Sequence, residues 1–130
     1  KIVDEIVRSM DLTKDNTGLI LNIVINYGSR KEIINACKEI SKDVKNGKLE
    51  IEKIDEALFK RYLYTGGLPD PDLLIRPSGE IRISNFLLWQ IAYSELWFTE
   101  VLWPDFTRED LIKALKDYQR RERRFGGIRK

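Results

Sequence analysis

DLLIRPSGEIRISNFLLWQIAYSELWF, residues 72–98, is the stretch that decides the fold class of this chain. It opens with a short apolar run, residues 72–76, which a Pro-Ser-Gly turn ends, as is typical of a buried parallel strand that leads into a loop. Ser84 follows at a position suited to cap a helix that runs to about residue 94. The apolar run at residues 96–103 then stops at a proline and predicts a second strand.

The same alternation extends over the rest of the chain. LILNIVINY, residues 19–27, lies between two glycines and predicts a third strand that is buried on most of its surface. Four further segments have apolar residues at helical spacing: residues 1–10, 33–44, 52–63 and 107–125. In the last of them Thr107 and Asp110 have capping-box spacing, and Gly126 and Gly127 are expected to end the helix. The chain therefore predicts an α/β layered fold with a central, mostly parallel sheet flanked by helices.

Composition excludes several classes of site. The 130 residues indicate a single domain, and they include no His and one cysteine, Cys37. His-based triads, zinc sites that use His and an internal disulfide are therefore excluded. No apolar run approaches the roughly 20 residues of a membrane-spanning helix, so we expect no transmembrane segment. The chain opens directly on a helical pattern without Met, and we expect it to be part of a longer domain.

The loop after residues 72–76 is a candidate anion site. Arg76 and Arg82 bracket a Ser-Gly turn, so their guanidinium groups could converge on one phosphate or diphosphate. Ser84 and the amides after it would add a hydroxyl and the positive end of a helix. The alternative is that Arg76 pairs with a structural carboxylate such as Glu80 and that Ser84 is only a cap.

Glu95 is a candidate metal ligand. It follows Ser84 by eleven residues, among aromatic and aliphatic neighbours. A carboxylate in this setting binds a hard cation, pairs with an arginine or points to water. Beside a diphosphate site, binding of a cation is favoured over the other two roles, because Mg²⁺ is commonly held by one or two carboxylates together with substrate phosphates.

The basic end of the chain has two readings. Residues 120–130 hold six basic residues and one acidic residue, while the whole chain carries a net charge of +2. Positive charge at a helix C-terminus is favoured by the helix dipole. RNA binding is the alternative, but no aromatic stacking platform or RNA-recognition motif accompanies the basic run, so we expect no nucleic-acid partner.

These residues carry a close resemblance. Residues 72–98, with NTGLILNIVINYGSR before them and VLWPDF and RRERRFGG after them, resemble the C-terminal half of the cis-prenyltransferase family, in particular its bacterial undecaprenyl diphosphate synthases. The resemblance implies that residues 1–130 are the C-terminal part of a single such domain. It also implies a homodimeric, cytoplasmic, Mg²⁺-dependent transferase of isoprenoid and cell-wall biosynthesis, without a membrane span but with possible peripheral membrane association for product release.

The implied reaction adds isopentenyl diphosphate in cis to an allylic diphosphate, farnesyl diphosphate, to make undecaprenyl diphosphate. Arg76, Arg82 and Ser84 match the family positions that hold isopentenyl diphosphate, and Glu95 matches its magnesium-linked glutamate. In the family Arg76, Arg82 and Glu95 would count as catalytic.

Three other residues match family positions that bind substrate. Arg124 and Gly126 fit an Arg-x-Gly pattern that reaches the active site across the dimer. Leu19 resembles a position in the tunnel for the growing chain.

Two departures from the family pattern matter. Pro77 stands where the family loop commonly has Thr, which removes a backbone N–H and a hydroxyl. The family's Asp-Gly-Asn-Arg-Arg stretch, which binds the allylic diphosphate and metal, and its Ser-x-x-Asn-Trp loop are not in this sequence. We therefore predict that the chain alone is inactive and tends to aggregate or needs a partner. A non-catalytic partner subunit, or an inactive fragment of such a synthase, is the alternative reading.

Overall fold

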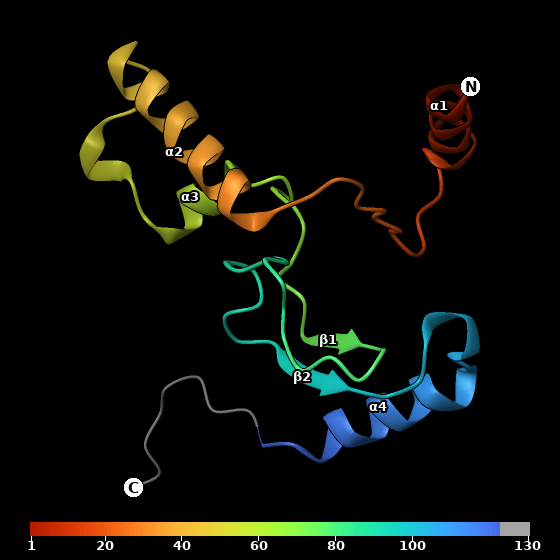
Figure 1. Cartoon of the computed structure of the whole chain (residues 1–130). Helices are drawn as coiled ribbons and strands as arrows, with labels where there is room; N and C mark the ends of the chain where they lie inside the picture. The colour runs from red at the N-terminus through yellow and green to blue at the C-terminus, as the bar shows by residue number, and fades with distance from the viewer. Residues whose placement is uncertain (123–130) are drawn as a thin grey trace, which may run out of the picture.

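The computed structural model describes residues 1–122 and contains four α-helices, two short 3-10 helices and two strands within that range (Figure 1). In chain order these elements are α1 (Ile2–Thr13), α2 (Ser29–Lys45), η1 (Ile51–Lys53), α3 (Glu56–Arg61), β1 (Leu73–Arg76), β2 (Glu95–Phe98), η2 (Trp103–Asp105) and α4 (Arg108–Arg120). Helices α1, α2 and α4 lie where the apolar spacing predicted helices.

The sheet is parallel, as predicted. β1 and β2 pair side by side, with Leu73 opposite Glu95 and Arg76 opposite Phe98. The pair runs between α4 and the region of α2 (Figure 1). The α/β class with a parallel sheet flanked by helices is therefore confirmed, although the described residues form two strands and not three.

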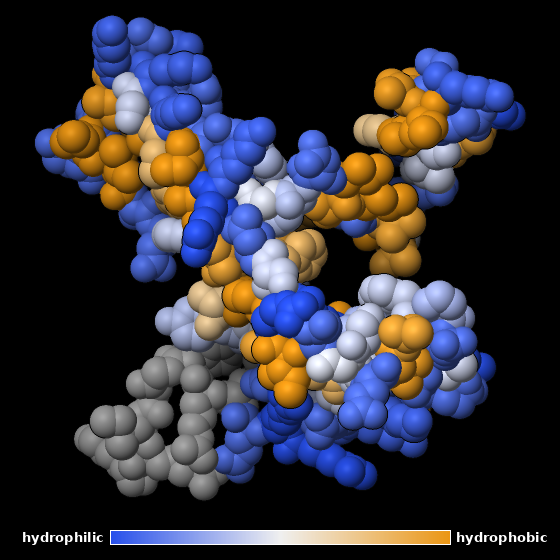
Figure 2. Space-filling model, in the orientation of Figure 1, coloured by the Kyte–Doolittle hydropathy of each residue, from blue (hydrophilic) through white to orange (hydrophobic). Residues whose placement is uncertain are grey.

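The predicted strand at residues 19–27 is wrong for the described chain. This segment runs from α1 to α2 as an extended trace without strand structure (Figure 1). Its apolar side chains lie open on the surface, next to those of α1 (Figure 2). A strand needs a neighbouring strand to receive its backbone hydrogen bonds, and no described segment lies in that position.

The predicted helix at residues 84–94 is also wrong. Ser84, Asn85 and Leu87 have positive φ values of 46°, 64° and 46°, which interrupt a right-handed helix at its first turn. The segment forms successive turns instead. Asn85 explains why, because its carbonyl accepts from Ser29 N at 2.9 Å and its side-chain oxygen accepts from Arg30 N at 2.9 Å. The segment therefore caps α2 instead of starting a helix of its own.

Three elements are shorter than predicted. α3 begins at Glu56, because the Asp55 side chain accepts from Leu58 N at 2.7 Å and so caps it. β2 ends at Phe98, and the chain beyond it continues beside the loop that follows β1. α4 begins with the predicted capping box but ends at Arg120, before the glycines, which lie outside the described residues.

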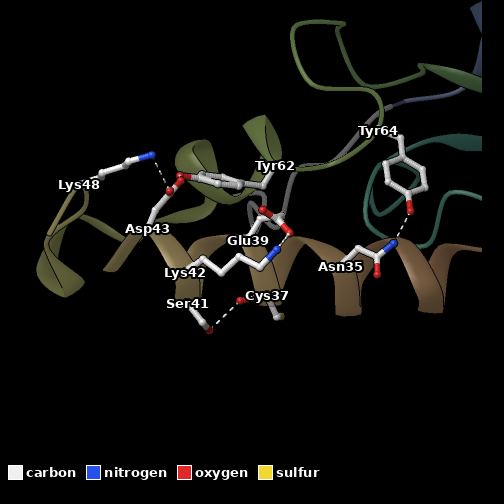
Figure 3. Close-up of polar contacts among 9 residues, drawn as sticks. All are labelled: Asn35, Cys37, Glu39, Ser41, Lys42, Asp43, Lys48, Tyr62 and Tyr64. Carbon is white, nitrogen blue, oxygen red and sulfur yellow. Dashed lines mark hydrogen bonds and ion pairs between the residues drawn. The ribbon is translucent and has the colours of Figure 1, made fainter. Parts of the chain in front are cut away.

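The described core is small. Six apolar side chains are buried within residues 1–122: Ala36, Ile40, Leu63, Leu74, Ile91 and Ala114. Polar contacts join α2 to the chain that follows α3: Tyr62 donates to Asp43 at 2.8 Å, and Asn35 donates to the Tyr64 hydroxyl (Figure 3). No helix within the described residues is long and apolar enough to cross a membrane.

Candidate functional site

Arg76 is the last residue of β1, at the carboxyl end of the parallel strands, where α/β sheets commonly bind ligands. Its Nη1 donates to the Arg82 carbonyl oxygen and, at 3.2 Å, to the Ser84 hydroxyl. Both acceptors are neutral oxygen atoms. The guanidinium is half-buried, and these two bonds hold it at the end of β1.

A surface hollow of about 430 Å³ lies beside this guanidinium. Arg76, Ser78, Glu80 and Ser84 supply its polar groups, and Phe86 and Trp103 are among its apolar ones. A strongly held donor next to a hollow of this size is suited to bind a small anion such as a diphosphate.

Arg82 and Arg76 do not converge in this structure. The Arg82 guanidinium forms an ion pair with Glu80, while its backbone carbonyl receives the bond from Arg76. The alternative reading of the sequence had Arg76 paired with a carboxylate such as Glu80, but Glu80 pairs with Arg82 instead. This pair is exposed, with 61% of the Arg82 side chain and 41% of the Glu80 side chain open to solvent, so its strength is small.

The predicted helix N-terminus does not contribute to the site. Ser84 offers its hydroxyl from a left-handed turn and does not cap a helix. The amides of the Ser-Gly turn are also occupied: Ser78 N donates to Val101 O at 2.9 Å, and Gly79 N donates to Thr99 O at 2.8 Å. These two bonds hold the loop against the chain that follows β2. Because both amides are already bonded, the donors available to a ligand in the hollow are side chains.

Glu95 lies at the other end of the sheet. It is the first residue of β2 and faces Leu73, three residues before Arg76, which is about 10 Å along the strand. Arg121 Nη1 donates to Glu95 Oε2 at 2.9 Å and to Leu96 O at 3.0 Å. The hydrogen bond to Glu95, followed by one to Asp117, raises the pKa of Arg121. Of the three readings of Glu95, pairing with an arginine is the one that the structure contains.

The described residues do not form a metal site on their own. No three acidic or cysteine side chains among residues 1–122 lie close enough to hold an ion. Glu95 would supply one carboxylate, and its bond to Arg121 already occupies one oxygen. A metal at this position would therefore need ligands from a substrate or from outside the described chain.

The remaining predicted site residues are not near the hollow or are not described. Leu19 is 91% exposed in the extended segment before α2. Arg124 and Gly126 lie outside the described residues.

The sequence interpretation missed a buried polar cluster around Glu32 and Ser29. Glu32 is fully buried and accepts from the Tyr27 hydroxyl, from Tyr64 N at 2.7 Å and from Gln90 Nε2 at 3.2 Å. Burial, together with the hydrogen bond to Glu32, raises the pKa of Tyr27 to about 12. Ser29, also fully buried, accepts from Leu88 N at 2.9 Å. The signal that could have pointed to it is Glu32, an acid on the face of the amphipathic helix α2 that also carries the buried residues Ala36 and Ile40.

The sequence comparisons decide the family. Residues 1–126 match the family model for undecaprenyl diphosphate synthase prenyltransferases. The chain belongs to this cis-prenyltransferase family. Similar curated relatives are the isoprenyl transferases of Clostridium tetani, 59% identical over 96% of this chain and 49% of the relative, and of Clostridium perfringens, 60% identical over 93% and 48%. The chain thus spans about half the length of the curated relatives it matches.

Solved structures agree with the family and the fold. Lavandulyl diphosphate synthase from Lavandula x intermedia, solved with dimethylallyl diphosphate, is 41% identical, with a TM-score of 0.91 over 95% of this chain and 53% of that one. A probable undecaprenyl diphosphate synthase from Campylobacter jejuni is 34% identical, with a TM-score of 0.79 over 97% and 56%. In this chain, Arg76 lies at the end of the parallel strand β1 and lines the hollow of about 430 Å³.

Proposed function

We propose that the complete protein is a cis-prenyltransferase that condenses isopentenyl diphosphate onto an allylic diphosphate, farnesyl diphosphate, to form undecaprenyl diphosphate. In this proposal residues 1–130 supply the isopentenyl diphosphate site. The observation that carries the proposal is Arg76, whose guanidinium is held by two neutral oxygen atoms and lies beside a hollow of about 430 Å³. A similar protein was solved with an allylic diphosphate, dimethylallyl diphosphate, and this supports the substrate class.

Arg76 would hold the diphosphate of isopentenyl diphosphate, with the Ser84 hydroxyl fixing the guanidinium at 3.2 Å. Arg82 would also bind the diphosphate after its ion pair with Glu80 breaks. Breaking this pair costs little free energy because both side chains are exposed. The reaction needs the allylic diphosphate to leave and the double bond of isopentenyl diphosphate to attack, so the chain's part is to position one reactant and compensate its charge.

The other implied residues and partners stay predictions. They are Arg124 and Gly126 as substrate contacts across a homodimer, Leu19 in the product tunnel, and Mg²⁺ bound through Glu95. The cytoplasmic location, the role in cell-wall biogenesis and the peripheral membrane contact also stay predictions of the resemblance.

The proposal is tested in a chimera that joins this chain to the part of the Clostridium tetani isoprenyl transferase that it does not match. We expect incorporation of labelled isopentenyl diphosphate with farnesyl diphosphate as primer, and chromatography of the product measures its length. Arg76→Ala should raise the KM for isopentenyl diphosphate by about 10- to 150-fold, because one charge-assisted hydrogen bond contributes about 1.5–3 kcal/mol.

Arg61→Ala is the matched control, because Arg61 is an exposed arginine on α3 that does not line the hollow. An Arg76→Ala chimera with the wild-type KM for isopentenyl diphosphate would contradict the assignment. Activity of the 130-residue chain by itself would contradict the prediction that this chain supplies only one of the two substrate sites.

A further inference from the structure

The hollow beside Arg76 has one polar part and one apolar part. Apart from Arg76, two serines and a glutamate, the residues that line it are apolar: Leu74, Ile75, Pro77, Ile83, Phe86 and Trp103. An inorganic anion needs only hydrogen-bond donors and positive charge. An apolar lining around a few polar groups is typical of a site for a ligand that carries a hydrocarbon group next to its anionic group.

Trp103 is the most open of these apolar residues. It is 63% exposed, whereas Phe86 is 39% exposed and Leu74 is buried. The ring of Phe86 also packs edge-on against Tyr27, with 5.8 Å between the ring centroids, so part of its surface is already in use. Trp103 therefore offers the largest free apolar area at the hollow, and its indole ring is the largest side chain in the lining.

The fold holds Trp103 at the rim of the hollow. Ser78 N donates to Val101 O at 2.9 Å, which fastens the chain two residues before Trp103 to the loop after β1. Pro104 lies in the first turn of η2, and Phe106 N donates to Trp103 O at 3.2 Å. The rings of Trp103 and Phe106 pack with 5.3 Å between their centroids. A ring that is held before a ligand arrives loses little conformational entropy on binding.

We propose that Trp103 is a specificity-determining residue of this hollow, whose indole ring packs against the hydrocarbon group of the ligand that Arg76 holds by its diphosphate. In this proposal, which rests on the proposed function, the hydrocarbon group is the isopentenyl group. Burial of that group against the ring adds affinity that depends on apolar area and not on charge. Arg76 would select for an anion, and Trp103 would select for an anion with an apolar tail.

The test compares isopentenyl diphosphate with methyl diphosphate, which has the same charged group but a single methyl as its tail. Isothermal titration calorimetry of the 130-residue chain measures the dissociation constant of each ligand. Trp103→Ala should weaken binding of isopentenyl diphosphate about four- to fifteenfold, because a fully buried methylene group contributes about a fourfold factor in affinity and one ring buries about one to two of them. Binding of methyl diphosphate should change less than about twofold, and Arg76→Ala should weaken both ligands alike.

Two further variants complete the comparison. Trp103→Phe keeps an aromatic ring and should retain most of the affinity for isopentenyl diphosphate. Leu102→Ala is the matched control, because Leu102 is the neighbouring residue, is 54% exposed and does not line the hollow. Since most of the Trp103 side chain is open, its replacement should leave the fold intact, and an unchanged affinity for methyl diphosphate reports this directly.

Three results would overturn the inference: no loss of affinity for isopentenyl diphosphate in Trp103→Ala, an equal loss for both ligands, or the same effect in Leu102→Ala. A wild-type chain that binds both ligands equally well would overturn it too, but the anion site of the proposed function would remain. A wild-type chain that binds neither ligand, or an Arg76→Ala chain that binds both normally, would overturn the proposed function, and the inference with it.

Discussion

The side-chain amide of Gln90 donates to both oxygens of Glu32, at 3.2 and 3.3 Å, and so joins α2 to a segment 58 residues further along the chain. Glu32 is fully buried and Gln90 is 2% exposed. The same amide nitrogen also donates to the Thr65 hydroxyl at 2.9 Å, which adds a third segment. The segment that contains Gln90 begins at Ser84, and the cluster joins this segment to α2.

Glu32→Gln should destabilise the chain by about 1.5–3 kcal/mol, because one carboxyl oxygen that accepts hydrogen bonds becomes an NH₂ group facing another donor. Urea unfolding followed by circular dichroism measures the change. Glu39→Gln is the control, since Glu39 forms an exposed pair with Lys42 and its substitution should stay within about 0.5 kcal/mol. Equal effects of the two substitutions would show that the buried cluster contributes nothing.

The raised pKa of Tyr27 predicts that the free energy of unfolding decreases at high pH. Its phenol has a pKa of about 12 in the folded chain and about 10 in an unfolded one. Between these values the unfolded state releases a proton that the folded state keeps, so stability falls as the pH rises from about 10 to 12. Urea midpoints across this range measure the slope, and Tyr27→Phe should reduce it.

Tyr62 provides a comparison for the same experiment. The hydrogen bond to Asp43 raises the pKa of Tyr62 as well. Tyr62→Phe should therefore also reduce the loss of stability with rising pH, independently of Tyr27→Phe. An unchanged slope in Tyr27→Phe would contradict the assignment of its proton to the bond with Glu32.

Gly28 is predicted to be intolerant of a side chain. A Cβ added there would lie 2.9 Å from Asn85 Nδ2, and Asn85 is held in place by its bonds to the first turn of α2. Gly28→Ala should therefore displace the cap and cost about 0.5–2 kcal/mol in urea unfolding. Gly18→Ala, where nothing lies within 4 Å of the added Cβ, should have little effect. A neutral Gly28→Ala would mean that Asn85 does not stabilise α2.

Glu80→Gln is predicted to strengthen anion binding. It releases the Arg82 guanidinium from its exposed ion pair and removes a negative charge from the rim of the hollow. Affinity of the chain for inorganic pyrophosphate should rise about two- to fivefold, because such a pair is worth about 0.2–1 kcal/mol. Isothermal titration calorimetry measures it, with Glu109→Gln, an exposed acid on α4, as the control. Weaker or equal binding would exclude Arg82 from the anion site.

Local signals predicted the elements that local interactions stabilise. Thr107 and Asp110 form the predicted capping box, and each side chain receives a backbone hydrogen bond from the other residue. The run at residues 72–76 contains β1, and its partner strand is parallel. In the site, Arg76 and Ser84 do lie together, because a short loop confines residues eight apart.

Other parts of the site depended on contacts that no local pattern contains. The helix expected at residues 84–94 fails because Asn85 serves the N-terminus of α2, 55 residues earlier in the sequence. Glu95 pairs with Arg121, 26 residues later in the sequence, a partner that spacing did not select.

The sequence by itself determined the family, the parallel α/β class and the helices with apolar stripes and caps. Each of these follows from patterns among residues that are close together in the sequence. Tertiary structure decided which side chains serve the site and whether residues 19–27 are a strand. A strand and a buried carboxyl group both depend on partners distant in the chain, and their hydrogen bonds form only where the fold brings such partners together.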